Sequence, residues 1–192
     1  MATWLYDLNT PPTWVYTKAA SAYTALVQLY ARSGQLPTAD GMFQKKTAQS
    51  RACRFGCPDS ETPHHIFSVC HRFSVWQTKE LESLTTAIQR KLDDADIETL
   101  HQSSIIRLAK FIFTDSVTVW PLHSTVYFLG QIPKIEPLLS PTSMSNSVNQ
   151  SRLIHNIAAD LHLSSVRLAS RIFGDLQKEI SKRHADLYGN RA

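Results

Sequence analysis

Apolar residues recur at helical spacing through the N-terminal part of the chain. Residues 13–33 carry apolar side chains three or four positions apart and are followed by Gly34, which can end a helix in the left-handed conformation. Pro37 ends the turn, and Thr38 can then cap a short helix that Gly41 weakens. The pattern therefore predicts two helices before the first cysteine.

Two longer amphipathic runs occupy the middle of the chain. Residues 73–92 and 97–113 each place apolar side chains along one stripe, and the acidic sequence at 93–96 separates the two runs. Residues 116–130 differ, because β-branched and aromatic side chains dominate and Pro121 interrupts them. We expect two helices followed by extended or irregular chain that packs against them.

The C-terminal part predicts one long helix or two. Residues 133–150 contain three prolines and four serines, which is typical of a linker or a long exposed loop. An apolar stripe then runs from Ile154 through Phe173 to Ile180. Such a stripe usually belongs to the core, and it can alternatively bind a protein partner or a second copy of the chain.

Length and pattern together predict a mainly α fold. A chain of 192 residues with 43% hydrophobic residues can bury one core. We divide it into a helical region at 1–132, a linker or loop at 133–150 and a C-terminal helical segment at 151–192.

Composition narrows the classes of partner and compartment. The net charge of +4 permits contact with RNA or DNA, although a solvated surface explains it equally well. Neither a secretory signal nor an unbroken apolar run of membrane-spanning length is evident, so we expect no membrane partner. Three cysteines, an odd number, fit poorly with a disulfide framework. We expect an intracellular protein, nuclear or cytoplasmic.

The three cysteines form a pattern typical of a metal site. Cys53, Cys57, His65 and Cys70 give the spacing C-x3-C-x7-H-x4-C within the stretch CRFGCPDSETPHHIFSVC. Three thiolates and one imidazole are a preferred ligand set for structural Zn²⁺. Gly56 allows the backbone to turn tightly between the first two ligands. The sequence therefore predicts a small zinc-stapled knuckle, a segment of about residues 50–72 held together by the ion.

The second half of this knuckle predicts a short and irregular helix. Thr62 can cap a helix whose first residue is Pro63, and this helix would carry His65 toward the metal. The five-residue step to Cys70 rotates roughly 140° around a regular α-helix, so both side chains cannot easily face one ion. We therefore expect the helix to end near Cys70 or to widen locally.

Other interpretations of the cluster stay open at this point. His64 and His71 are alternative ligands, although the ligand spacing favours His65. The cysteines can also be small buried hydrophobic residues, as free cysteines often are. A catalytic pair of Cys70 and His71 is disfavoured, because adjacent residues rarely present both groups to one substrate.

The same region resembles the zinc-binding (CCHC-type) segment that follows the reverse-transcriptase domain in LINE-like (non-LTR) retrotransposon polyproteins. In that family a Leu-Pro-Thr turn precedes two cysteines, then Glu-Thr-x-x-His and a last cysteine. The matching residues are Leu36, Pro37 and Thr38 in the turn, Glu61, Thr62 and His65 in the central run, and Cys53, Cys57 and Cys70 as the cysteines. Residues 119–133 and 166–177 are similar to the tails of fungal elements. The family commonly separates its first cysteines by two residues, whereas this chain uses three.

The resemblance implies a non-catalytic nucleic-acid-binding module. The aspartate pair that a polymerase needs to hold Mg²⁺ is not recognisable, since Asp93 and Asp94 are better read as a helix stop. A zinc ion with four protein ligands has no open position for activated water, so we expect no enzymatic activity. Phe55 and Phe67 can offer stacking faces to unpaired bases, although packing beneath the metal is the favoured role for both. The basic residues expected to contact phosphates are Lys45, Lys46, Arg51, Arg54 and Arg72. The alternatives are a protein-interaction or structural module, or a relic of such an element.

Overall fold

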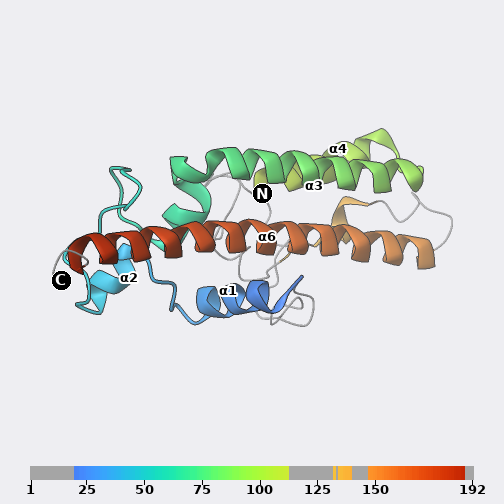
Figure 1. The fold of residues 1–192 in the computed structure, drawn as a ribbon. Helices are drawn as coiled ribbons and strands as arrows, with labels where there is room; N and C mark the ends of the chain where they lie inside the picture. The colour runs from blue at the N-terminus through green and yellow to red at the C-terminus, as the bar shows by residue number, and fades with distance from the viewer. Residues whose placement is uncertain (1–19, 113–131, 133, 140–146, 189–192) are drawn as a thin grey trace.

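A single long helix, α6 (Ser147–Tyr188), runs along the middle of the molecule. In the computed structural model, which describes residues 20–112, 132, 134–139 and 147–188, α3 and α1 pack on opposite sides of α6 (Figure 1). Helix α4 packs on α3. The named elements of this part of the chain are all helical, so the predicted mainly α fold is confirmed.

The remaining helices are shorter than α6 and follow the predicted order. The α-helices are α1 (Ala22–Arg32), α2 (Ala39–Gln44), α3 (Ser74–Asp94) and α4 (Thr99–Ile112). The short elements are the π-helix η3 (His65–Val69) and the 3₁₀ helices η4 (His71–Phe73) and η5 (Glu136–Leu138). Ala52 and Ser60 form an isolated antiparallel bridge.

Local capping decides where the first two helices begin and end. The Ser21 side chain accepts a hydrogen bond from the Thr24 amide, and the Thr24 hydroxyl accepts one from the Ser21 amide. This capping box starts α1 later than the pattern at 13–33 predicts. Residues 13–19 of that range lie outside the described part. Gly34 has φ +66°, as the predicted left-handed C-terminal cap requires. Thr38 caps α2 through a hydrogen bond from the amide of Gly41.

The core lies between α6 and the two helices that flank it. Helix α3 contributes Leu84, Ile88 and Leu92, each at most 2% exposed. Burying a side chain of this size stabilises the fold by about 1.5–3 kcal/mol. The buried positions of the predicted α6 stripe are Ile157, Leu161, Val166, Ala169, Phe173 and Leu176. The interpretation of this stripe as core is therefore confirmed.

The segment before α6 contributes to the core as well. Ile135 and Leu139 are buried on either side of η5, and η5 packs on α4. Helix α6 already begins at Ser147, inside the range 133–150 that we assigned to a linker or exposed loop. The irregular chain predicted at 116–130 lies outside the described residues. Among the helices that are described, none combines the length and apolar character needed to cross a membrane.

Candidate metal centre

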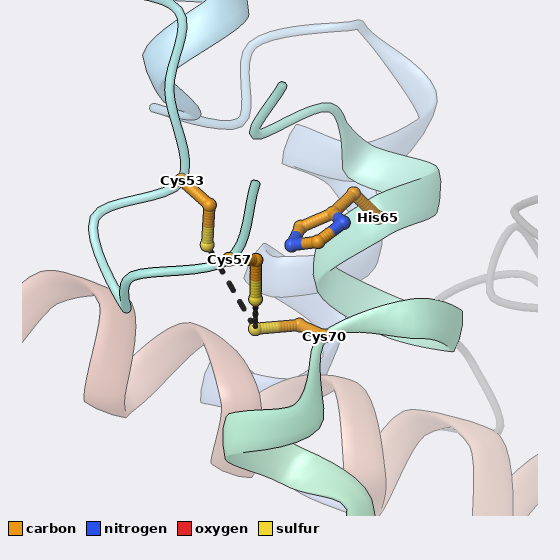
Figure 2. Close-up of side chains that lie close together, drawn as sticks. All are labelled: Cys53, Cys57, His65 and Cys70. Carbon is orange, nitrogen blue, oxygen red and sulfur yellow. Dashed lines mark hydrogen bonds between the residues drawn. The ribbon is translucent and has the colours of Figure 1, made fainter. Parts of the chain in front are cut away.

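The four residues of the predicted metal site come together beside the C-terminal part of α6. Cys53 and Cys57 lie on a loop, His65 begins η3, and Cys70 follows the end of η3 (Figure 2). Their potential ligand atoms all lie within 4.8 Å of one another, and all four residues are buried. The arrangement can hold a metal ion.

The distances between the sulfur atoms fit a tetrahedral site. Cys70 Sγ lies 3.5 Å from Cys57 Sγ and 3.9 Å from Cys53 Sγ. Metal–sulfur distances of about 2.3 Å give a regular tetrahedron with edges of about 3.8 Å. A disulfide would require about 2.05 Å between sulfurs, so the three cysteines are free thiols. Both sulfur–sulfur distances are close to the edge length of such a tetrahedron.

A tight reversal of the chain positions the first two cysteines. Gly56 has φ +84°, a conformation that L-residues with a side chain rarely adopt, and its amide donates to the carbonyl of Cys53. The amide of Cys53 in turn donates to the carbonyl of Asp59. The sequence correctly predicts Gly56 as the residue that lets this loop close.

The second half of the site is a helix that widens by one residue. Thr62 caps it by accepting a hydrogen bond from the amide of His65 at 3.1 Å. The amide of Cys70 donates to the carbonyl of His65 at 2.7 Å, which is the i→i+5 pattern of a π-helix. Cys70 itself is extended and precedes η4. The local widening brings residues five apart to one side, as the spacing of His65 and Cys70 predicts.

The ring of His65 is placed as a metal ligand would be. Its Nε2 is buried and points toward the sulfurs (Figure 2). Within the described part of the chain, this nitrogen neither donates nor accepts a hydrogen bond. Its Nδ1 lies 3.8 Å from a carboxylate oxygen of Asp59, a partner that can orient the ring. Burial lowers the pKa of His65, which favours the neutral form that binds metals. A buried nitrogen aimed at three thiols in this way is suited to bind a cation.

The two alternative histidines lie outside the four-residue cluster. Nδ1 of His71 is 3.0 Å from Cys57 Sγ, at the exposed edge of the site. His64 is partly buried and immediately precedes η3. The geometry therefore favours His65 as the fourth ligand, with His71 positioned to donate a hydrogen bond to the Cys57 thiolate.

Burial also affects the thiols. It raises the pKa of Cys53 and the pKa of Cys70, and the neighbouring cysteines raise both further. Metal binding must displace the protons that the raised pKa values favour on Cys53 and Cys70.

A buried carboxylate connects the Leu-Pro-Thr turn with the loop at residues 53–57, which carries the first two candidate ligands and which we call the metal loop. Glu61 accepts hydrogen bonds from the amides of Ala39 at 2.7 Å and Arg54 at 2.8 Å. The Arg54 guanidinium lies 3.4 Å from Glu61 Oε1 and donates to the carbonyl of Pro37 at 3.0 Å. Sequence reasoning assigned Glu61 to a motif without this role. The only sequence feature that could have indicated this role is the position of Glu61 within the predicted site, three residues after Pro58 and four before His65.

The predicted phosphate-contacting residues have different surroundings. Lys45 and Lys46 are exposed, and the side chains of Arg51 and Arg72 are 53% and 57% exposed. Arg54 is different, because its side chain is only 10% exposed and is engaged by Glu61 and Pro37. We therefore correct the assignment of Arg54: it stabilises the loop from within and does not present its charge to a ligand.

The two phenylalanines considered for base stacking are used in packing. Phe67 is 2% exposed. The ring of Phe55 packs edge-on against Phe73, with ring centroids 5.0 Å apart. Phe67 therefore has no face for a base, and both rings pack as we favour from the sequence, beneath the metal site rather than against a nucleic acid.

Comparisons with models of known protein families, with curated proteins and with solved structures found no match.

Proposed function

We propose that this chain is a non-catalytic, zinc-stapled module that binds nucleic acid. The observation that carries the proposal is the buried cluster of three thiols and one imidazole with tetrahedral spacing. That donor set is typical of structural Zn²⁺, and four protein ligands leave no coordination position for activated water. A site that needs free thiolates belongs in a reducing, intracellular compartment.

The charges beside the metal loop support nucleic acid as the partner. Lys45, Lys46, Arg51 and Arg72 lie in or next to the segments that carry the ligands, and all four are exposed. Phosphate groups attract such cations independently of sequence. The resemblance to the region after a retrotransposon reverse transcriptase, stated above from the sequence, favours the same class of partner.

The alternative of a protein-interaction module depends on α6, and the structure lends it less support. The apolar stripe that would bind a partner or a second copy is buried against α1 and α3.

Metal analysis tests the first half of the proposal. We expect one zinc per chain in the parent protein and loss of stoichiometric zinc in Cys53→Ser, Cys57→Ser, His65→Ala and Cys70→Ser. His64→Ala is the matched control, because it removes a neighbouring imidazole that lies outside the cluster. Stoichiometric zinc retained in His65→Ala would overturn the ligand assignment.

Binding measurements at two salt concentrations test the second half. Affinity for RNA or DNA should fall as salt rises, because each phosphate contact releases counterions. Binding that is absent at low salt, or that does not change with salt, contradicts the proposal.

A further inference from the structure

The zinc-loaded loop lies next to a pocket that has no role in metal binding. This open pocket of about 550 Å³ is lined by Phe43, Gln44, Lys46, Ala48 and Arg51, and we call it the α2 pocket. We propose that it binds one unpaired base and its phosphate from single-stranded RNA or DNA. The inference rests on the proposed function and deepens it, since it names the form of nucleic acid and the residues that select it.

Phe43 supplies the aromatic surface that Phe55 and Phe67 do not. It lies near the end of α2 and is 41% exposed, which is unusual for a ring of this size. The guanidinium carbon of Arg51 lies over this ring, 5.6 Å from its centroid, so the two groups cover each other on one side and a base would stack on an outer side of the pair. A phenyl ring and a guanidinium plane are two surfaces on which bases stack. The volume of the pocket lies within the range of small-ligand sites, about 300–1,000 Å³.

Lys46 places a positive charge at the pocket, and its backbone is in the left-handed conformation. Its φ is +58°, in the left-handed region that favours glycine or asparagine, and its amide donates to the carbonyl of Phe43 at 2.9 Å. This left-handed residue follows the C-cap of α2, as Asp96 with φ +52° follows that of α3, so the conformation belongs to the helix terminus. The charge can reach a phosphate attached to a base that stacks on Phe43.

Asp40 fixes the polar side chains of the pocket. Its Oδ1 accepts a hydrogen bond from Arg51 Nε at 2.5 Å, and its Oδ2 accepts one from Gln44 Nε2 at 2.7 Å. Asp40 is itself only 7% exposed. The salt bridge is made through Nε, whereas the two terminal nitrogens of a guanidinium are well suited to a phosphate. Because Asp40 compensates part of the Arg51 charge, Lys46 provides most of the attraction for a phosphate.

The aromatic face favours a single strand over a duplex. Bases in a duplex are already stacked on both sides, so only an unpaired base can lie against Phe43. RNA and DNA share this chemistry, and parallel measurements with both strands distinguish them.

The pocket is attached to the metal loop through backbone hydrogen bonds. The amide of Glu61 donates to the carbonyl of Arg51 at 2.8 Å, and the amide of Asp40 donates to the carbonyl of Glu61. Arg51 also lies two residues before the ligand Cys53. A metal ion that orders the loop would therefore also order Arg51 and Asp40, which shape the pocket.

Fluorescence anisotropy of the full-length zinc-loaded protein tests the inference. The probes are labelled single-stranded RNA, single-stranded DNA and a duplex of the same sequence. Phe43→Leu should weaken single-strand binding by about 5- to 100-fold, as loss of one stacked base does, and should change duplex binding much less. Phe43→Tyr keeps the ring and should retain affinity. Circular dichroism and zinc content establish that each variant is folded.

Charge is tested separately from stacking. Lys46→Asn removes the charge and tolerates the left-handed backbone, so it should reduce the slope of log affinity against log salt by about one. Lys79→Gln removes an exposed charge on α3, outside the pocket, and should leave single-strand affinity within about twofold of the parent.

The outcomes separate the two proposals. Parent protein that binds single strands while Phe43→Leu and Lys46→Asn bind equally well overturns the α2 pocket and leaves the proposed function standing. Parent protein that binds neither single strands nor duplex at low salt overturns the proposed function, and the pocket inference with it. Selective loss of single-strand affinity in Phe43→Leu supports both.

Discussion

Glu61 contributes more to the local structure than any charge on the surface of the metal loop. Its carboxylate is fully buried and receives two backbone amides and the Arg54 guanidinium. A buried carboxylate is tolerated only when it is paired and hydrogen-bonded in this way. Glu61 therefore fixes the Leu-Pro-Thr turn and the metal loop in one arrangement.

Replacing Glu61 by alanine should destabilise the zinc-loaded protein by about 3–5 kcal/mol, because Arg54 would remain buried without its partner. Glu61→Gln keeps a hydrogen-bond acceptor and should therefore destabilise the protein less than Glu61→Ala. Urea denaturation measures the difference, with exposed Glu82→Gln as the matched control. A loss in Glu61→Ala no larger than that of the control would show that Arg54 is compensated in another way.

His162 on α6 predicts a dependence of stability on pH. It is fully buried, and burial lowers its pKa to about 4 from an unfolded value of about 6.5. The unfolded chain therefore binds a proton between these values while the folded chain does not. The contribution to stability is complete above pH 6.5 and falls by about 3 kcal/mol as the pH drops toward 4.

His162→Leu should remove this part of the pH dependence. Denaturation at several pH values between 4 and 7 measures it, and the metal site contributes equally to parent and variant. His155→Leu, an exposed position of the same helix, serves as the control. If the free energy of unfolding changes with pH in His162→Leu as it does in the parent, His162 is not the group responsible for the pH dependence.

At the scale of elements, the π-helix η3 is the feature on which the metal geometry depends. One additional residue per turn places His65 and Cys70 on the same side, a position that residues four apart occupy in an α-helix. The π-helix is thus the local backbone solution to a five-residue ligand spacing.

Inserting one alanine after Ser68 should separate His65 and Cys70 by six residues, a spacing that turns the two side chains away from each other in an α-helix. A shift of one residue corresponds to about 100° in an α-helix. We expect loss of stoichiometric metal, measured by the visible absorbance of the Co²⁺ complex, whereas Ser68→Ala keeps the register and the metal. Unchanged Co²⁺ spectra in the insertion variant would mean that another histidine replaces His65.

The sequence predicts the regular elements and the ligand positions better than it predicts the environment of single side chains. Periodicity located α3, α4 and α6, and ligand spacing identified both the cluster and the irregular turn after Thr62. It did not reveal that Arg54 points inward, because a basic residue near a turn has no periodic pattern to orient it. The burial of Ile135 depends on tertiary packing against α4, which composition cannot report.

At the scale of the whole molecule, the metal site is joined to the C-terminal end of α6. Arg183 donates a hydrogen bond to the carbonyl of Arg54, on the loop between the first two ligands. Arg72, two residues after the last ligand, lies 3.4 Å from Asp175. The π-helix η3 also packs on α6. The last turns of α6 therefore share their stability with the metal loop, whereas the centre of α6 belongs to the core with α1 and α3.

Removing the metal should consequently unfold the protein in parts. Structural zinc binding is coupled to folding, so a chelator should abolish amide protection first in residues 50–72. Because Arg183 and Asp175 lose their partners, the segment 175–188 should lose protection next. The core around Ile88 and Ile157, which does not contact the ion, should retain its protection.

Hydrogen exchange followed by mass spectrometry, with and without chelator, measures this order. His65→Ala without chelator should reproduce the pattern of the chelated parent, which separates the effect of the metal from that of the reagent. Uniform protection of residues 50–72 after chelation would mean that hydrophobic packing of Phe67 and Phe73 alone holds the loop. Loss of protection at Ile88 together with the loop would mean instead that the metal site and the helical core unfold as one cooperative unit.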